Sequence, residues 1–189
     1  DNARPICKFQ SPEDIVALFK SFDKDFRHLD GFCNNAGVAA PPAKTAELPL
    51  AQVQYTFAVN TVGAFVAVQE AIKRMSTTYG GKGGSIVNMS SIAAKLGGSG
   101  AQVDYAASKG AIDTLTVGLA KELANECVFV NDAGTAQIYT DIHTAMGMPD
   151  RVNQLKDLVP MKRGGTADEV AEATYWLLSD ASSYTTGTL

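Results

Sequence analysis

Apolar residues follow two different periods along this chain. Short β-branched or apolar runs that end in polar residues are typical of buried strands, and they occur at residues 29–37 (LDGFCNNAG), 84–91 (GSIVNMSS) and 127–131 (CVFVN). Between them lie longer segments in which apolar residues recur every three or four positions, as in helices that cover a sheet. Parallel strands need helical crossovers, so the alternation predicts an α/β protein built on a doubly wound parallel sheet.

Helix start and stop signals mark several of the intervening segments. Ser11 and Pro12 precede acids and predict a helix that begins there and runs to about residue 26. Residues 48–80 are predicted to be helical, with a possible break near residues 60–63 and a glycine stop at Gly80. No repeat, low-complexity tract or linker divides the chain, so residues 1–189 are interpreted as one domain.

Two later helices are also predicted. The segment 103–126 carries apolar residues at helical spacing, and Thr166 followed by acids predicts a final helix in which Trp176 belongs to the core. The expected core stripes of the first of these helices are Ala107, Ala111, Leu115 and Leu119, with Ile112 and Leu123 beside them.

The composition limits which kinds of binding partner are expected. The net charge is -4 with 19% charged residues and no basic run, which predicts neither nucleic-acid nor membrane binding. Three widely spaced cysteines (Cys7, Cys33, Cys127) are expected to be reduced, partly buried thiols of a cytoplasmic protein. The acidic residues are scattered and predict no metal site. The first residue is Asp rather than Met, which indicates that further residues precede it.

Polar residues gather where the predicted strands end. Asn34–Gly37, the serines Ser90 and Ser91, and residues 138–143 each follow a strand, and the pair Tyr105 and Lys109 opens the helix after the serines. Ligands of open parallel sheets bind outside the carboxyl ends of the strands, so these segments are expected to converge on one crevice.

The residue types at this crevice suit proton transfer at a carbonyl or an alcohol. A tyrosine and a lysine four residues apart are common on helix surfaces, so the pair alone is not specific. A phenol with an ordinary pKa of ~10 is a poor base at neutral pH. The Lys109 ammonium is expected to favour the Tyr105 phenolate, which makes Tyr105 a candidate general acid and base. Ser91 could hold the substrate oxygen, and Asn60 could fix a water molecule that passes protons to Lys109.

In this order, NNAG (34–37), VN (59–60), SIVNMSS (85–91), YAASK (105–109) and TDI (140–142) resemble the short-chain dehydrogenase/reductase family. The resemblance extends from about Leu29 to the end of the chain, and its last 30 residues are similar to glucose-dehydrogenase-like and 3-oxoacyl-reductase-like members. It implies a Rossmann-type fold, a homodimer or homotetramer, and an oxidoreductase that interconverts an alcohol and a carbonyl with NAD or NADP. The implied catalytic residues are Asn60, Ser91, Tyr105 and Lys109, and the implied cofactor-binding residues are Asn34, Asn35, Ala36, Gly37, Tyr105, Lys109, Ile138 and Thr140.

Two features depart from the family pattern. The glycine-rich turn that cradles the cofactor diphosphate is missing from the sequence, so roughly 50–60 further residues are expected before Asp1. Thr135-Ala136 stand where the family usually has Pro-Gly. The alternative is therefore a non-catalytic or truncated relative that serves as an assembly or binding subunit. Of the remaining polar residues, His28 and His143 are expected to be incidental, a substrate contact by His143 is the less favoured reading, and Arg163 could approach an acidic substrate.

Overall fold

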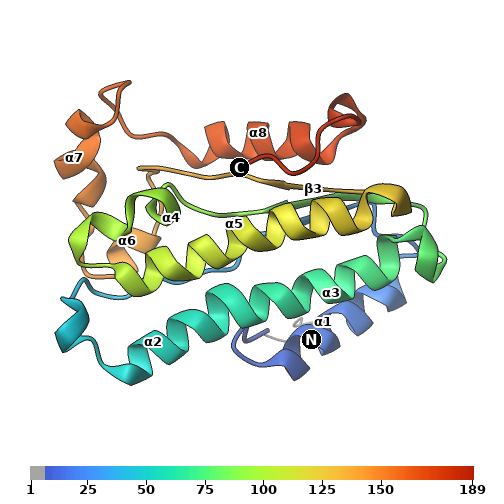
Figure 1. Ribbon diagram of the computed structural model, residues 1–189, viewed down its shortest axis with the longest axis horizontal. Helices are drawn as coiled ribbons and strands as arrows, with labels where there is room; N and C mark the ends of the chain where they lie inside the picture. The colour runs from blue at the N-terminus through green and yellow to red at the C-terminus, as the bar shows by residue number, and fades with distance from the viewer. Residues whose placement is uncertain (1–6) are drawn as a thin grey trace.

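The computed structural model describes residues 7–189, with Ser99 described by its backbone alone. Its centre is a parallel sheet with helices on both faces, as the sequence predicts (Figure 1). The strands lie in the order β1-β2-β3 and are Gly31–Asn34 (β1), Gly84–Asn88 (β2) and Val128–Asp132 (β3). One face is covered by α1 (Pro12–Asp25), α3 (Ala64–Met75) and α5 (Val103–Leu123), and the other by α8 (Ala167–Leu178).

The main core lies between the sheet and the first group of helices. Strand residues Ile86, Val128 and Val130 are fully buried there, as β-branched residues on a covered sheet should be. They pack in one apolar cluster with residues of α1, α3 and α5: Ile15, Phe19, Ala67, Val68, Ala71, Met75, Leu119, Ala120 and Leu123. The cluster holds the last turns of α5 against the sheet, and the first turns of the same helix carry Tyr105 and Lys109.

The remaining elements are short. They are the α-helices α2 (Leu50–Phe57), α4 (Ala93–Leu96), α6 (Ile142–Ala145) and α7 (Arg151–Leu155), and 3-10 turns at Thr45–Glu47, Thr77–Tyr79, Gly98–Gly100, Ala124–Glu126, Lys156–Leu158 and Asp180–Ser182. None of the helices within residues 7–189 is long and apolar enough to cross a membrane.

The predicted helix starts are confirmed. The Ser11 side chain accepts a hydrogen bond from the Asp14 amide at 3.1 Å and caps α1. Thr166 and Glu169 form a reciprocal capping box at the start of α8, in which each side chain bonds the other residue's backbone amide. These caps satisfy amides that have no partner within the helix.

The break predicted near residues 60–63 is also confirmed, as a π-helical turn at Ala58–Gly63 between α2 and α3. Gly63 is required there, because a β-carbon at this position would lie 2.1 Å from the Phe9 carbonyl oxygen. The helix ends earlier than predicted. α3 stops at Met75, and Gly80, with φ of 87°, instead ends the 3-10 turn that follows.

One prediction about burial is wrong, and a second is wrong in part. Trp176 is 47% exposed rather than part of the core. On α5, the buried side combines Ile112, Leu119 and Leu123 with small residues, whereas Ala107 is exposed. The close packing of α5 on the sheet and on α2 explains why small residues line its inner face. The three cysteines are free thiols, with Cys7 partly buried and Cys33 and Cys127 exposed.

Candidate active site

A cavity of about 830 Å³ lies at the carboxyl ends of the strands. Its volume falls in the range of small-molecule sites. Segments that follow each strand form its walls, together with the first turns of α5 and parts of α6, α7 and α8. The predicted site residues that line it are Asn35, Gly37, Ser91, Tyr105, Lys109, Ile138 and Thr140. The convergence expected from the sequence is therefore present.

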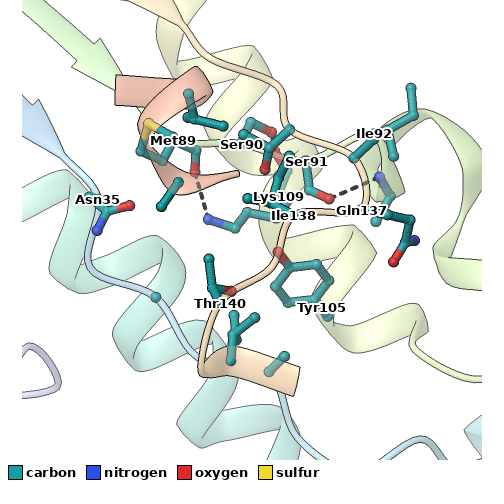
Figure 2. A pocket seen from close by; sticks show the side chains of 18 of the residues that line it. Asn35, Met89, Ser90, Ser91, Ile92, Tyr105, Lys109, Gln137, Ile138 and Thr140 are labelled. Atoms are coloured by element: carbon teal, nitrogen blue, oxygen red, sulfur yellow. Dashed lines mark hydrogen bonds between the residues drawn. The ribbon is translucent and has the colours of Figure 1, made fainter. Parts of the chain in front are cut away.

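Tyr105 lies in the first turn of α5, with its ring directed into this cavity beside Ser91 (Figure 2). Burial raises the pKa of the Tyr105 phenol, and the neighbouring Ser91 hydroxyl partly offsets this rise. The phenol is therefore protonated at neutral pH in this structure. It is placed to donate a proton to an oxygen that is bound between the two hydroxyl groups.

Lys109 is 6% exposed and enters the same space from the next turn of α5. Its Nζ donates a hydrogen bond to the Met89 carbonyl oxygen at 2.6 Å and lies 5.9 Å from the centre of the Tyr105 ring. Burial lowers the pKa of Lys109 to about 8, while Asp132 and Asp113 act in the opposite direction. The expectation that Lys109 pulls the Tyr105 pKa down is wrong for this structure, because burial of the phenol dominates.

The two serines after β2 have different surroundings. The Ser90 hydroxyl donates its one proton to the Asp113 carboxylate at 2.5 Å and lies 3.2 Å from the Lys109 carbonyl oxygen, so it ties this segment to α5. The Ser91 oxygen accepts a hydrogen bond from the Ala93 amide at 3.2 Å, and its hydroxyl group acts on Tyr105 within the cavity (Figure 2). This geometry favours Ser91 over Ser90 as the residue that holds a substrate oxygen.

Asn60 lies on the π-helical turn and acts as a clamp. Its Oδ1 accepts from the Val38 amide at 2.8 Å, and its Nδ2 donates to the Val38 carbonyl at 2.8 Å and to Ser108 Oγ at 3.1 Å. Both amide donors are thus in use, and Asn60 is not among the residues that line the cavity. The clamp holds the backbone beside Lys109, since a β-carbon at Gly37 would lie 3.5 Å from both Asn60 Oδ1 and Lys109 Nζ.

The residues of the NNAG segment (34–37) have two different roles. Asn34 ends β1 and is buried, and its Nδ2 donates to the Ala64 carbonyl at 3.2 Å and to Asn88 Oδ1 at 2.9 Å. The structure thus does not bring Asn34 or Ala36 to the cavity lining, whereas Asn35 and Gly37 do line it. The side chain of Asn34 joins β1 to β2 and α3 instead of facing a ligand.

The loop after β3 is held in place without the Pro-Gly pair. The Thr135 carbonyl accepts from the Ile92 amide at 2.8 Å. Farther along, the Gln137 carbonyl accepts from the Gly165 amide at 2.9 Å, and the Tyr139 amide donates to the Gly165 carbonyl at 3.0 Å. These backbone bonds on both sides fix the loop, and its residues Ile138 and Thr140 line the cavity (Figure 2).

Asp132, at the end of β3, was not singled out by the sequence. It is 5% exposed, its carboxylate is bonded to no side chain, and the Ser90 backbone amide acts on it only weakly, against the rise in its pKa. Burial and the charge of Asp113 raise the pKa of Asp132 to about 7, against the attraction of Lys109 and Lys95. A buried lysine in the cavity wall and a buried acid outside the wall, both with pKa values near neutral, therefore act on each other.

The cavity wall also includes Gln102, His143 and Arg151, of which only His143 was considered from the sequence. The Nε2 atom of His143 lies 3.0 Å from the Ile138 carbonyl oxygen, and burial lowers the pKa of this histidine. Arg163, expected as a possible contact for an acidic substrate, is exposed and pairs with Glu169 at 2.5 Å. It does not line the cavity. No local signal marks Arg151, because it meets Gln102 across 49 residues of chain.

Comparisons with known proteins agree with this fold and site. A family model described as Enoyl-(Acyl carrier protein) reductase matches residues 6–189. The chain is 46% identical over 173 residues to an uncharacterised oxidoreductase, YgfF, of Escherichia coli strain K12, across 92% of this chain and 70% of that protein. It is 36% identical to an L-xylulose reductase of Caenorhabditis elegans, across 90% of this chain and 66% of that protein.

A solved structure of NAD+-bound xylitol dehydrogenase matches with a TM-score of 0.84 at 28% identity, covering 97% of this chain and 75% of that one. Fold and site thus define an oxidoreductase with a Rossmann-type sheet. The chain belongs to the short-chain dehydrogenase/reductase family.

Proposed function

We propose that this protein interconverts an alcohol and a carbonyl with NAD or NADP, and that Tyr105 is the general acid and base. The observation that carries the proposal is the convergence of Tyr105, Ser91 and Lys109 on one cavity at the carboxyl edge of the sheet. Two relatives whose names state such chemistry, an L-xylulose reductase and a xylitol dehydrogenase, support it. Both names place sugars and polyols among the candidate substrates, alongside sterol-like and oxoacyl compounds.

The residues present fit the nicotinamide end of such a cofactor. Lys109 and Tyr105 supply two hydrogen-bonding groups from adjacent turns of α5, while Asn35 and Gly37 on one side and Ile138 and Thr140 on the other line the same cavity. The bound cofactor would supply or accept the hydride. Lys109 and Tyr105 would hold its ribose, and Thr140 would hold its carboxamide. Asn34 and Ala36 are left out of this set, because they do not line the cavity.

The chain's own groups would handle the proton. In the reduction direction, Ser91 donates a hydrogen bond to the carbonyl oxygen, and Tyr105 transfers its proton to that oxygen as negative charge develops there. Its raised pKa keeps the phenol protonated and ready to donate. Lys109, one helical turn away, would then return a proton to Tyr105, and its pKa of about 8 suits proton exchange near neutral pH. A water molecule near the π-helical turn of Asn60 would complete the relay to solvent.

We also propose a homodimer or homotetramer. One face of α5 is uncovered, since Ala107, Thr114 and Gly118 are exposed and a β-carbon at Gly110 or Gly118 would meet nothing within 4 Å. Apolar side chains are exposed nearby on the π-helical turn and α3, where Val62 is 52% and Phe65 47% exposed. Small residues let helices of two subunits approach closely, and closed symmetry would cover both faces. Light scattering measures the mass in solution: the mass of a dimer or tetramer would support the proposal, and that of a monomer would contradict it.

The Tyr105→Phe variant tests the function. It keeps the ring and its packing but removes the transferable proton, so we expect kcat/KM to fall by at least ~100-fold with folding unchanged. Tyr79→Phe, at an exposed tyrosine in the 3-10 turn after α3, is the matched control and should leave the rate unchanged. Both variants are measured in the complete natural protein with NADH and NADPH. If the Tyr105→Phe variant turns over substrate at the parent rate, Tyr105 and Lys109 have no catalytic role, and the proposed function is wrong.

A further inference from the structure

Asp132 is a buried acid to which the proposed reaction gives no role. It ends β3, and its side chain lies on the same face of that strand as Val128 and Val130, which belong to the core beneath α5. Asp132 is 5% exposed, and its carboxylate is bonded to no side chain. Burying a charged group without a good partner costs stability, so an acid kept in such a place calls for an explanation.

A single peptide group, between Met89 and Ser90, connects Asp132 with Lys109. Its carbonyl oxygen accepts a hydrogen bond from Lys109 Nζ at 2.6 Å, and its N–H group acts weakly on the Asp132 carboxylate. The peptide is trans, so its carbonyl and its N–H group point in opposite directions. The ammonium therefore lies at the negative end of this peptide dipole and the carboxylate at its positive end, which favours the charged form of both groups.

The charged groups that act on Asp132 come from two helices. α5 supplies Lys109 and Asp113, and α4 supplies Lys95. The Ser90 hydroxyl donates to Asp113 at 2.5 Å, which holds this second acid beside the same segment. Of the charges that act on Lys109, that of Asp132 is the largest and that of Asp113 the next, and both favour the ammonium form. Asp132 is thus the main electrostatic partner of Lys109, although it does not line the cavity.

The surroundings of Lys109 make such a partner necessary. Lys109 is 6% exposed, and burial disfavours its ammonium form and lowers its pKa to about 8. In the proposed reaction this ammonium returns a proton to the Tyr105 phenolate after each reduction, which the neutral amine cannot do. The pKa of Asp132 is about 7, so its carboxylate is ionised in the pH range in which Lys109 begins to lose its proton.

We infer that Asp132 is a positioning residue that keeps Lys109 charged beside Tyr105 and so extends carbonyl reduction to higher pH. Its carboxylate acts on the ammonium directly and through the peptide group between them, without touching a substrate. The inference rests on the proposed function, because it concerns the proton that Lys109 returns in the same cavity.

Trace labelling of the complete natural protein with acetic anhydride tests the inference without any need for turnover. The rate at which Lys109 is acetylated follows its neutral fraction, and peptide mass spectrometry measures that rate as a function of pH. The midpoint for the parent should lie at about pH 8. Asp132→Asn should lower this midpoint by about 1 pH unit, because a nearby opposite charge is lost. A midpoint that is unchanged or higher in the variant overturns the inference.

Glu70→Gln is the matched control. Glu70 is another buried acid, 7% exposed, but it forms ion pairs with Lys73 and Arg74 on α3. Its replacement removes these ion pairs and should lower stability, yet it should leave the Lys109 midpoint at the parent value. If Glu70→Gln lowers the midpoint as much as Asp132→Asn does, a general loss of stability explains both shifts, and the inference is overturned.

The pH profile of turnover separates an effect on Lys109 from a structural effect. The probes are L-xylulose and ethyl acetoacetate, each with NADH and NADPH. Asp132 is mainly protonated at pH 5.5, so Asp132→Asn should match the kcat/KM of the parent there. At pH 8 the variant should be about 3- to 10-fold slower, because less of its Lys109 is protonated. An equal loss at both pH values would indicate a structural role only and overturns the inference.

The two readouts keep the inference apart from the proposed function. A lower Lys109 midpoint in Asp132→Asn, with no reduction of either probe, would support the action of Asp132 on Lys109 and count against the proposed reaction. Reduction of a probe with the same midpoint and the same pH profile in parent and variant would leave the proposed function standing and overturn the inference.

Discussion

Asn88 and Asp132 end neighbouring strands and are direct partners in the register of β2 and β3. Both side chains are buried. The Asn88 amide is bonded on both sides, since it accepts from Asn34 at 2.9 Å and donates to Thr116 Oγ1 at 2.9 Å. The Asp132 carboxylate, one strand away, is bonded to no side chain, and the Ser90 backbone amide is near enough only to oppose the rise in its pKa.

Asn88 therefore stabilises the structure, whereas Asp132 makes the stability depend on pH. Satisfied buried amides such as Asn88 and Asn60 stabilise one arrangement and do not titrate. An unsatisfied buried carboxylate costs stability whenever it is charged. Native proteins keep few such groups, and those they keep cluster near sites of chemistry. Asp132 lies close enough to Lys109 to alter its pKa, which links it to the proposed acid and base.

The largest expected effect on stability is at Asp132. Its pKa is raised from 3.8 to about 7 in the folded protein, so stability should fall as pH rises from about 4 to about 7 and then level off. Asp132→Asn removes this dependence. We expect the variant to gain about 1–4 kcal/mol of unfolding free energy over the parent at pH 8 and little at pH 4.

Urea unfolding at several pH values measures this, and the Asp132→Asn variant keeps the charged neighbours Asp113, Lys109 and Lys95 unchanged. Asp113→Asn should give a smaller gain in the same pH window, because that charge only assists in raising the Asp132 pKa. A variant Asp132→Asn that is less stable than the parent at pH 8 would show that the carboxylate is satisfied after all, and the comparison with Asn88 would fail.

Replacing Asn60 is expected to lower the unfolding free energy, by a smaller amount than the gain from replacing Asp132. Asn60→Ala removes three hydrogen bonds and leaves the Val38 amide and carbonyl without partners. We expect a loss of about 1–3 kcal/mol that does not depend on pH between 5 and 8, because no group titrates in this clamp. Asn125→Ala, at an exposed position of the 3-10 turn after α5, is the matched control. A variant as stable as the parent would contradict the role of Asn60 as a clamp.

Local sequence signals predicted the parts of the fold that depend on neighbours in the chain. Ser11 and Thr166 cap their helices as expected, because an N-cap bond spans only three residues. The convergence of Ser91, Tyr105, Ile138 and Thr140 was also predictable, since the carboxyl ends of parallel strands meet at one edge. Trp176 shows the limit of such signals. Periodicity places a residue on a helix face but does not say how much of that face the rest of the structure covers.

Long-range contacts decided what the sequence left open. Nothing near Asn34 or Asn60 in the sequence indicates that their side-chain amides bond to Asn88 and Val38, and neither residue lines the cavity. Arg151 was missed and Arg163 was considered instead, because only the folded chain brings Arg151 to Gln102 and Arg163 to Glu169. The pKa of Asp132 likewise depends on burial, which its own neighbours in the sequence do not reveal.

The central claim is that Tyr105 and Ser91 act on one substrate oxygen. A double-mutant cycle tests this most directly, with kcat/KM of Ser91→Ala, Tyr105→Phe and the double variant measured in the complete natural protein. Residues that act as a unit are strongly non-additive. The account predicts that Ser91→Ala, damaging by itself, costs little more once Tyr105 has been replaced. If the two losses multiply in full, or if Ser91→Ala alone has no effect, the two hydroxyls do not share an oxygen and the proposed chemistry is wrong.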